Sequence, residues 1–332
     1  MNDQPQNKAP RISILMPSWN AEKYVASTLD TIVMQSFTDW EAIVMDGGSK
    51  DRTVEIARGY QKKYPNIRIF SEPDEGPYHA IHKAALAARG EFLVEMCFSD
   101  GYLDKDWFAK CVAAMDADPE LSLVWGIPFD MTEEGELKGP SYVYARFLPD
   151  EYRAKSPKTP VLKKFIKKID VRRPSSILRV IKKINPTNAR MAIHMFKHEE
   201  PKNKEAWFLY WLETGTIFPD LNMFMTKKVF FDCMEPYVMG TRETGDWMQF
   251  YFNFNTKGFL SRCIPVPANF GRVHEGSVSD RVRGYNDEKH RRYIKMVVEF
   301  EKKTLSHPGQ FSFVDREGNP VRTLADYQGG PR

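Results

Sequence analysis

The sequence predicts an α/β protein with a doubly wound, mostly parallel sheet. Short apolar runs of strand length alternate with stretches of helical spacing over the first 130 residues, and Pro, Gly or Asp residues separate them. The runs are predominantly apolar, which is typical of buried strands. In sheets of this kind, ligands bind at the carboxyl ends of the strands.

Each expected element has a local signal. Pro17 ends the first strand, Asp51 is placed to cap the second helix, Gly90 ends the third helix and Asp118-Pro119 stops the fourth. The expected strands are Ile12–Met16, Trp40–Met45, Ile67–Phe70, Phe92–Met96 and Leu121–Ile127. The expected helices are Ala21–Gln35, Thr53–Tyr64, Tyr78–Ala88, Trp107–Ala117 and, later in the chain, Trp247–Phe254.

The composition excludes several classes of protein. With 332 residues, 42% of them hydrophobic, the chain is long enough for one large or two small domains and is neither disordered nor collagen-like. Its four cysteines form no Cys-x-x-Cys pair, which argues against structural zinc and for a reducing compartment. No apolar run approaches the ~20 residues of a membrane span, and the polar start lacks a signal peptide. We therefore expect a cytoplasmic protein.

The formal net charge of +4 is unevenly distributed. Residues 151–200 contain fourteen lysines and arginines against four acids, a net charge of +10, so the rest of the chain carries −6. Leu162, Phe165, Ile166 and Ile169 have helical spacing, and Pro174 separates this stretch from a second one. Two interpretations stay open: a solvated surface excursion, or a pair of basic amphipathic helices on an anionic membrane surface, through residues 155–190. Aromatic residues are not interleaved with the basic ones, so nucleic acid is not expected as a partner.

Polar residues follow the expected strands where ligands bind. Pro17-Ser18-Trp19-Asn20 comes after the first strand, Asp46-Gly47-Gly48-Ser49 after the second, and Ser99-Asp100-Gly101 after the fourth. Two acids from such strand ends can hold a nucleotide and a divalent cation, because hard cations prefer oxygen ligands and bridge phosphates. Asp-Gly-Gly alone is also a common turn, and no G-x-G-x-x-G or Walker sequence is present.

A further acid, Asp246, precedes the aromatic-rich Trp247–Phe254 helix. Taken alone, an acid at this position is more often a helix cap than a functional group. The order of the motifs changes this interpretation.

The motifs together resemble family 2 glycosyltransferases, which have the GT-A fold. The resemblance covers about residues 11–130 and 216–280, leaving out the basic middle and both tails. Its motifs are Ile14-Leu15-Met16-Pro17-Ser18-Trp19-Asn20, Asp46-Gly47-Gly48-Ser49-x-Asp51-x-Thr53, Glu72-Pro73-Asp74-Glu75-Gly76-Pro77-Tyr78, Ser99-Asp100-Gly101, Gly245-Asp246-Trp247 and Arg272-Val273-His274-Glu275-Gly276-Ser277-Val278-Ser279. Each motif is weak alone, but six in the family's order are a specific signal.

The resemblance implies roles for individual residues. Asp246 matches the catalytic base, Asp46 the acid that contacts the nucleotide base or ribose, and Asp100 with His274 the ligands of a divalent cation, Mn²⁺ or Mg²⁺. Gly101 departs from the pattern, because the family often has a further acid there. The residues implied to bind the nucleotide sugar are Pro17, Ser18, Asn20, Asp46, Ser49, Lys83, Ser99 and Asp100.

His79 and His82 replace two polar residues of a family motif and lie three residues apart on the expected third helix. They are interpreted either as ordinary hydrogen-bonded side chains or as a metal-binding pair.

The resemblance implies that the protein moves a sugar from a nucleotide-diphosphate sugar to an acceptor hydroxyl, with inversion. The expected process is the synthesis of a cell-surface polysaccharide or glycolipid, with a glycan or lipid-linked acceptor. The protein is expected to act at the inner face of the membrane. The alternative is a catalytically silent sugar-nucleotide-binding or scaffold protein, which the missing acid at Gly101 would explain. A nucleotidyltransferase is disfavoured because no basic Gly-rich loop follows the first strand.

The expected organisation divides the chain into five parts. These are a disordered arm (1–10), a nucleotide-sugar-binding half (11–130), a basic helical insertion (131–215), an acceptor-binding and catalytic half (216–280), and a charged C-terminal helix and tail (281–332).

Overall fold

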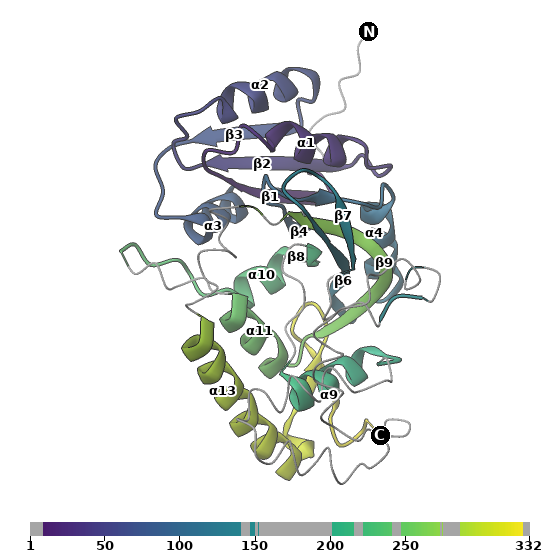
Figure 1. Cartoon of the computed structure of the whole chain (residues 1–332). Helices are drawn as coiled ribbons and strands as arrows, with labels where there is room; N and C mark the ends of the chain where they lie inside the picture. The colour runs from purple at the N-terminus through teal and green to yellow at the C-terminus, as the bar shows by residue number, and fades with distance from the viewer. Residues whose placement is uncertain are drawn as a thin grey trace, which may run out of the picture.

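A computed structural model shows a nine-stranded sheet flanked by helices, together with a separate two-stranded hairpin (Figure 1). The structure describes residues 9–140, 147–149, 152, 201–215, 222–240, 247–272, 274 and 286–327. The strand order in the large sheet is β3-β2-β1-β4-β8-β6-β9-β5, and β7 pairs with β6.

The first half of the sheet is parallel, as predicted. Its strands are β1 (Ile12–Ser18), β2 (Trp40–Asp46), β3 (Ile67–Ser71) and β4 (Phe92–Glu95), and each pairs in parallel with its neighbour. The helices between them are α1 (Val25–Val33), α2 (Thr53–Lys63) and α3 (Pro77–Ala87), and α4 (Trp107–Ala117) precedes β6. The N-cap residue of α2 is Arg52 and not the predicted Asp51. The Asp51 carboxylate still accepts a hydrogen bond from the amide of Thr53, the first residue of α2, at 3.0 Å.

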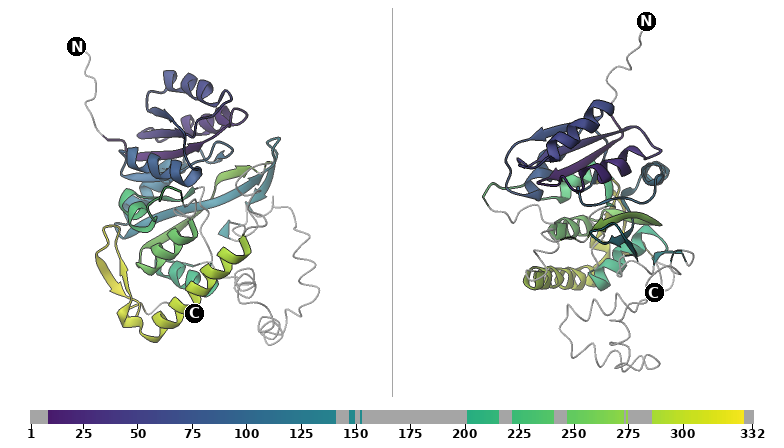
Figure 2. Two further views of the ribbon diagram at one scale, coloured as in Figure 1. Left: turned by 90° about the vertical axis from the view of Figure 1, so that its left-hand side faces the viewer. Right: turned by 45° about the horizontal axis from the view of Figure 1, so that its top comes forward.

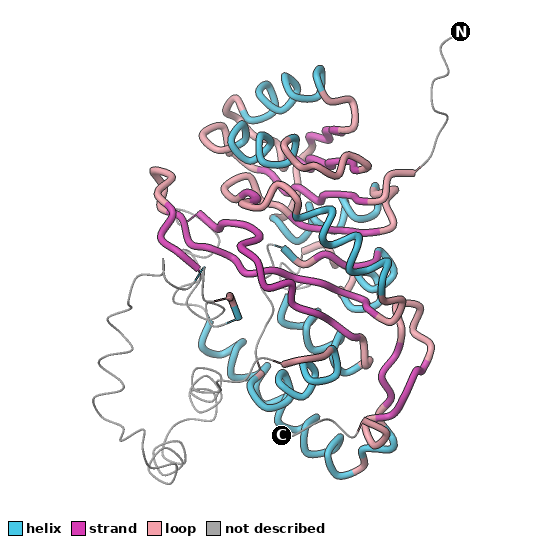
Figure 3. Tube along the Cα trace, turned by 90° about the vertical axis from the view of Figure 1, so that its right-hand side faces the viewer, coloured by secondary structure: helices cyan, strands magenta, loops and turns pink. Residues whose placement is uncertain are grey.

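The second half of the sheet mixes strand directions. The long strands β6 (Leu121–Met131) and β9 (Leu260–Arg272) are parallel to each other and curve across the molecule (Figure 3). Three short strands are antiparallel to their neighbours: β5 (Gly101–Tyr102), β7 (Leu137–Pro140) and β8 (Phe224–Thr226). The sheet is therefore mostly parallel, and its antiparallel strands are β5, β7 and β8.

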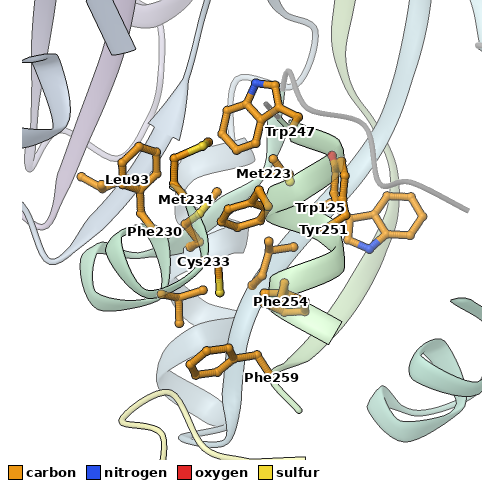
Figure 4. Close-up of a cluster of buried hydrophobic side chains, with 14 of the residues drawn as sticks. Leu93, Trp125, Met223, Phe230, Cys233, Met234, Trp247, Tyr251, Phe254 and Phe259 are labelled. Carbon is orange, nitrogen blue, oxygen red and sulfur yellow. The ribbon is translucent and has the colours of Figure 1, made fainter. Parts of the chain in front are cut away.

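Alternate residues of the central strands face two different cores, which defines a doubly wound sheet. Ile14 and Met16 pack in a cluster with α1, α2 and α4, whereas Leu15 packs in a second cluster. The second cluster contains α3 and the later helices α9 (Lys204–Thr214), α10 (Lys227–Cys233), α11 (Trp247–Thr256) and α13 (Asn286–Ser306). Figure 4 shows part of it, including Trp125 and the rings of Phe254 and Phe259, whose centroids lie 5.8 Å apart.

The C-terminal elements lie far from the first helices. Helix α13 is at the opposite end of the molecule from α1 and α2 (Figure 2). The hairpin of β10 (Ser312–Val314) and β11 (Pro320–Thr323) follows it after a single 3₁₀ turn (Pro308–Gln310). Arg322 anchors this hairpin through ion pairs with Glu120, at 2.5 Å, and with Glu205.

Several predicted features lie outside the described residues. They are residues 1–8 of the predicted arm, the basic helix pair within residues 155–190, the segment that contains Asp246, and positions 273 and 275–279 of the last motif. Among the helices that the structure does describe, none is both long and apolar enough to cross a membrane.

Candidate functional site

Asp46 lies at the carboxyl end of β2, in register with Ser18 at the end of β1. Its side chain is fully buried, and its carboxylate accepts hydrogen bonds from the amides of Gly48 (3.1 Å) and Ser49 (3.0 Å). The hydroxyls of Ser49 and Ser71 also donate to it, the latter at 2.8 Å, and the Ser18 hydroxyl lies 3.4 Å away. Asp46 thereby fixes the ends of three adjacent strands and the turn that follows β2.

The loop after β1 is joined to this turn. The Asn20 amide donates to the Ser49 hydroxyl, and the Asn20 side chain accepts from the Lys50 amide, both at 2.8 Å. Asn20 has a φ of 47°, a left-handed conformation that Asn tolerates better than most residues. Pro17 is buried beneath the loop, whereas the Trp19 side chain is 59% exposed. Trp19 was not predicted as a site residue, but an exposed aromatic ring beside a predicted nucleotide pocket is a candidate for stacking on a base.

Asp100 is brought to the same edge of the sheet by the turn after β4. Its side chain is only 5% exposed, and Oδ1 accepts hydrogen bonds from the Arg272 amide at 2.9 Å and the Ser99 hydroxyl at 3.2 Å. The Thr28 hydroxyl of α1 donates to the Asp100 carbonyl at 2.6 Å. Asp100 is therefore held between the first turns of α1 and the last residue of β9.

Gly101 has a steric reason to be glycine. It pairs with Phe270 across β5 and β9, and a Cβ atom at this position would lie 2.7 Å from the Phe270 ring and 3.0 Å from Thr31. A further acid at this position, as the family often has, would require the Phe270 ring to move.

Arg272 ends β9 beside Asp100, and His274 lies two residues further along the chain. The His274 ring packs against the Tyr24 ring of the segment before α1, with centroids 5.0 Å apart. The Arg272 guanidinium donates from Nε to the Ser99 carbonyl and from Nη1 to the Glu133 carbonyl, both at 3.1 Å. The predicted ligands therefore both lie near the start of α1: His274 packs against Tyr24, and the Asp100 carbonyl accepts a hydrogen bond from Thr28.

Glu133, in the turn between β6 and β7, closes this end of the site. Its carboxylate accepts hydrogen bonds from Lys23 at 2.5 Å and from the Tyr24 hydroxyl at 3.1 Å. These contacts lower the pKa of Glu133, the Lys23 ammonium having the largest effect. Neither Glu133 nor Arg272 was predicted as a site residue. Arg272 opens the last of the six motifs, but its contact with the Glu133 carbonyl depends on the pairing of β6 with β9.

The other predicted residues lie on α3, away from Asp100. Lys83 forms an ion pair with Glu72 at 2.8 Å. His79 accepts a hydrogen bond from the Glu75 amide at 3.2 Å and stacks on Tyr237, with centroids 4.7 Å apart.

The second histidine of α3, His82, packs edge-on against Phe231, and burial lowers its pKa. Within the described ranges, no group of three or more His, Cys, Asp or Glu side chains is arranged to hold a metal ion. The contacts of His79 and His82 are those of ordinary packed and hydrogen-bonded side chains, one of the two interpretations of the sequence.

The Glycosyl transferase family 2 model matches residues 13–162 of the chain. Residues 13–162 belong to glycosyl transferase family 2. This family 2 region contains β1 to β4 and the three strand-end motifs around Ser18, Asp46 and Asp100. Asp246, Arg272 and His274 lie outside it.

Curated relatives that match this part of the chain are named as synthases and glycosyltransferases. The chain is 27% identical over 147 residues to a hyaluronan synthase of Pasteurella multocida, a match that covers 44% of this chain and 15% of the relative. It is 30% identical over 122 residues to a PGL/p-HBAD biosynthesis glycosyltransferase of Mycobacterium tuberculosis, covering 36% of this chain and 46% of the relative. The chain thus spans less than half the length of these curated relatives.

Two solved structures are similar to the chain over most of its length. S. aureus TarS residues 1–349, in complex with UDP-GlcNAc, has a TM-score of 0.49 and 16% identity, covering 89% of this chain and 73% of that one. The mannosyltransferase PcManGT from Pyrobaculum calidifontis, in complex with GDP-Man and Mn²⁺, has a TM-score of 0.49 and 13% identity, covering 91% and 76%.

The residues next to the family 2 region's Asp100 are compatible with a divalent cation that also binds the substrate. A cation that bridges phosphates usually takes one or two protein ligands, and phosphate oxygens and waters complete its coordination. Asp100 supplies a carboxylate and His274 an imidazole at the same edge of the sheet, so the donor set fits this kind of site better than an all-protein cage.

Proposed function

We propose that the protein is an inverting glycosyltransferase that moves a sugar from a nucleotide-diphosphate sugar to an acceptor hydroxyl. The observation that carries this proposal is the meeting of three strand-end loops of the family 2 region, at Ser18, Asp46 and Asp100, at one edge of the sheet. Ligands bind at this edge in open α/β sheets. The names of the relatives support a cell-surface polysaccharide or glycolipid as the product.

The donor's nucleotide is proposed to lie over the ends of β1 and β2. Asn20, Ser49 and Asp46 form one hydrogen-bonded unit there, so the pocket is rigid before the donor binds. The exposed Trp19 ring is available to stack on a nucleotide base. Lys83 is included because its ion-pair partner, Glu72, directly follows β3 at the carboxyl edge of the sheet.

Asp246 is the proposed catalytic base, on the basis of the family resemblance and its place directly before α11. It removes the proton of the acceptor hydroxyl as that oxygen attacks the anomeric carbon. The bond from the anomeric carbon to the diphosphate oxygen breaks, and attack from the opposite face inverts the anomeric centre.

Asp100 and His274 are the proposed ligands of a divalent cation, Mn²⁺ or Mg²⁺, and Ser99 orients Asp100. When bound, such a cation neutralises negative charge on the leaving diphosphate. The buried position of Asp100, fixed by the Arg272 amide, orients its carboxylate before any ligand arrives.

The remaining assignments concern the whole protein. We propose that residues 11–130 bind the donor, that residues 216–280 contribute the acceptor side, and that the basic residues 155–190 bring the protein to an anionic membrane surface that holds a lipid-linked or glycan acceptor. We propose that the enzyme acts in the cytoplasm, at the inner face of the membrane.

The test is a panel of nucleotide sugars assayed for hydrolysis and transfer with Mg²⁺ or Mn²⁺, followed by Asp246→Asn. We expect one donor to react, and the variant to lose transfer by at least about 1000-fold while its donor affinity, measured by calorimetry, stays within about twofold. The control is Asp232→Asn, which removes a surface carboxylate paired with Lys228 and should keep full activity. Donor binding without turnover in the wild type would favour the silent sugar-nucleotide-binding protein instead.

A further inference from the structure

We propose that Arg272 is a fixed cation for the diphosphate of the donor and a further catalytic residue of the site. This inference rests on the proposed function and adds a residue to it that lies outside the family 2 region. Arg272 is the last residue of β9, and its amide donates to Asp100 Oδ1 at 2.9 Å. Its guanidinium therefore lies at the edge of the sheet where the donor's diphosphate is expected.

The guanidinium is held rigidly without being neutralised. Among the described residues, its acceptors are the carbonyl oxygens of Ser99 and Glu133, and the rings of Tyr24 and Phe270 lie 5.2 Å and 5.5 Å from its central carbon. Two of its five N–H groups are used in these hydrogen bonds, which leaves three for an anion. A planar cation fixed in this way loses little conformational entropy when it binds phosphate.

Other arginines on the described strands are paired differently. Each of them meets a carboxylate: Arg68 pairs with Glu41 at 3.0 Å, Arg262 with Asp118 at 3.0 Å, and Arg322 with Glu120 at 2.5 Å. Among the residues that the structure describes, no carboxylate lies within ion-pair distance of the Arg272 guanidinium. A positive charge kept without a partner at a ligand-binding edge points to an anionic ligand.

The surroundings of Gly101 give a second, independent reason. A further acid would sit at Gly101, but its Cβ would lie 2.7 Å from the Phe270 ring, and that same ring packs against the Arg272 guanidinium. This edge of the sheet thus has a cation next to a position where an acid would force the Phe270 ring to move. With Arg272 present and no acid at Gly101, the local charge is more positive, which favours a ligand with more than one negative charge.

The experiment compares the binding of nucleoside diphosphates and monophosphates, with uridine, guanosine, cytidine and thymidine forms as probes. Affinities of the full chain are measured by calorimetry in Mg²⁺ and in EDTA. In Arg272→Gln, the side-chain amide of the glutamine can still donate to one of the two carbonyl oxygens, but the positive charge is lost. We expect its diphosphate affinity to fall by about 10- to 100-fold and its monophosphate affinity by less than about threefold, since a charge-assisted hydrogen bond is worth about that much.

Two further variants separate charge from structure. Arg262→Gln is the matched control: the same residue type on the same strand, partly exposed, but paired with Asp118 at the other end of β9, and it should bind both nucleotides as the wild type does. Arg272→Lys restores the charge without the planar fork and should recover part of the diphosphate preference. In EDTA, the wild type should keep measurable diphosphate binding that Arg272→Gln lacks.

The outcomes are distinct. If Arg272→Gln binds diphosphate and monophosphate in the wild-type ratio, Arg272 only braces the turn at Glu133 and the inference is wrong. If Arg272→Gln does not fold, Arg272→Lys is used in its place. The inference is contradicted if Arg272→Lys has the wild-type ratio of diphosphate to monophosphate affinity and if diphosphate binding by the wild type does not weaken with salt. If the wild type binds no nucleoside diphosphate, the proposed function itself fails.

Discussion

The hydrogen bonds around Asp46 allow a quantitative prediction for the donor pocket. Replacing Asp46 with Ala removes a fully buried acceptor of two backbone amides, those of Gly48 and Ser49, and of the hydroxyls of Ser49 and Ser71. Hydrogen bonds to a charged group contribute about 1.5–3 kcal/mol each. The serine hydroxyls can rotate toward water, so we count only the two amides, at the lower limit. The expected loss in the free energy of unfolding is about 3 kcal/mol.

Asp46→Asn should cost less, about 1 kcal/mol, because its remaining oxygen can still accept from both amides. The assay is urea unfolding followed by circular dichroism, with the slope against urea checked to be the same in all variants. Asp116→Ala is the control, because Asp116 forms an exposed ion pair with Arg11 at 2.7 Å and should change stability by less than about 1 kcal/mol.

The result that would refute this reasoning is an Asp46→Ala variant within about 0.5 kcal/mol of the wild type. Nucleotide affinity gives a second comparison. The Ala variant should lose at least about tenfold in affinity, because the loops at Asn20 and Ser49 are no longer joined through a fixed turn. A stable Asn variant with a similar loss in affinity would show that the carboxylate itself meets the nucleotide, as the family resemblance implies.

Two further predictions concern contacts away from the donor pocket. Arg322 lowers the pKa of Glu120 from 4.5 to about 2, so this carboxylate stabilises the fold fully above pH 4.5 and progressively less as the pH falls toward 2. Glu120→Gln should therefore lose about 1 kcal/mol at pH 7, after allowance for its partial exposure, and the difference from the wild type in urea unfolding should shrink below pH 4.5. Tyr237→Phe removes the 2.8 Å hydrogen bond to Glu75 but keeps the ring, so amide exchange in residues 234–240 should accelerate about fivefold. An equal change in Tyr60→Phe, far from this loop, would show that the effect is not local.

Periodicity predicted the elements of the first half because their signals are local. The expected strand Trp40–Met45 and the helix Trp107–Ala117 agree with β2 and α4 to within one residue. The two-residue strand β5 was not predicted, since Gly101 and Tyr102 become a strand only by pairing with Phe270 and Asn269. Nothing near Gly101 in the sequence indicates that partner.

The candidate site divides in the same way. Asp46 and Ser49 are three positions apart in the sequence, so their grouping could be predicted, and the structure confirms that they are in contact. Arg272 and Glu133 meet through a hydrogen bond between residues 139 positions apart, so only the paired strands bring them together. Sequence reasoning therefore found the motifs that carry their own turns and missed the residues that depend on β6 and β9 being neighbours.

The C-terminal hairpin has a consequence for how the chain folds during synthesis. Phe313 is fully buried against Phe208, and the Val314 amide donates to the Gly258 carbonyl at 3.0 Å. Arg322, which bonds to Glu205, lies 117 residues after it. At about 5–20 residues per second, a ribosome needs roughly 6–23 s to add that length. During this interval, the apolar surface around α9 has no hairpin to cover it, so chaperone binding to the nascent chain should concentrate there.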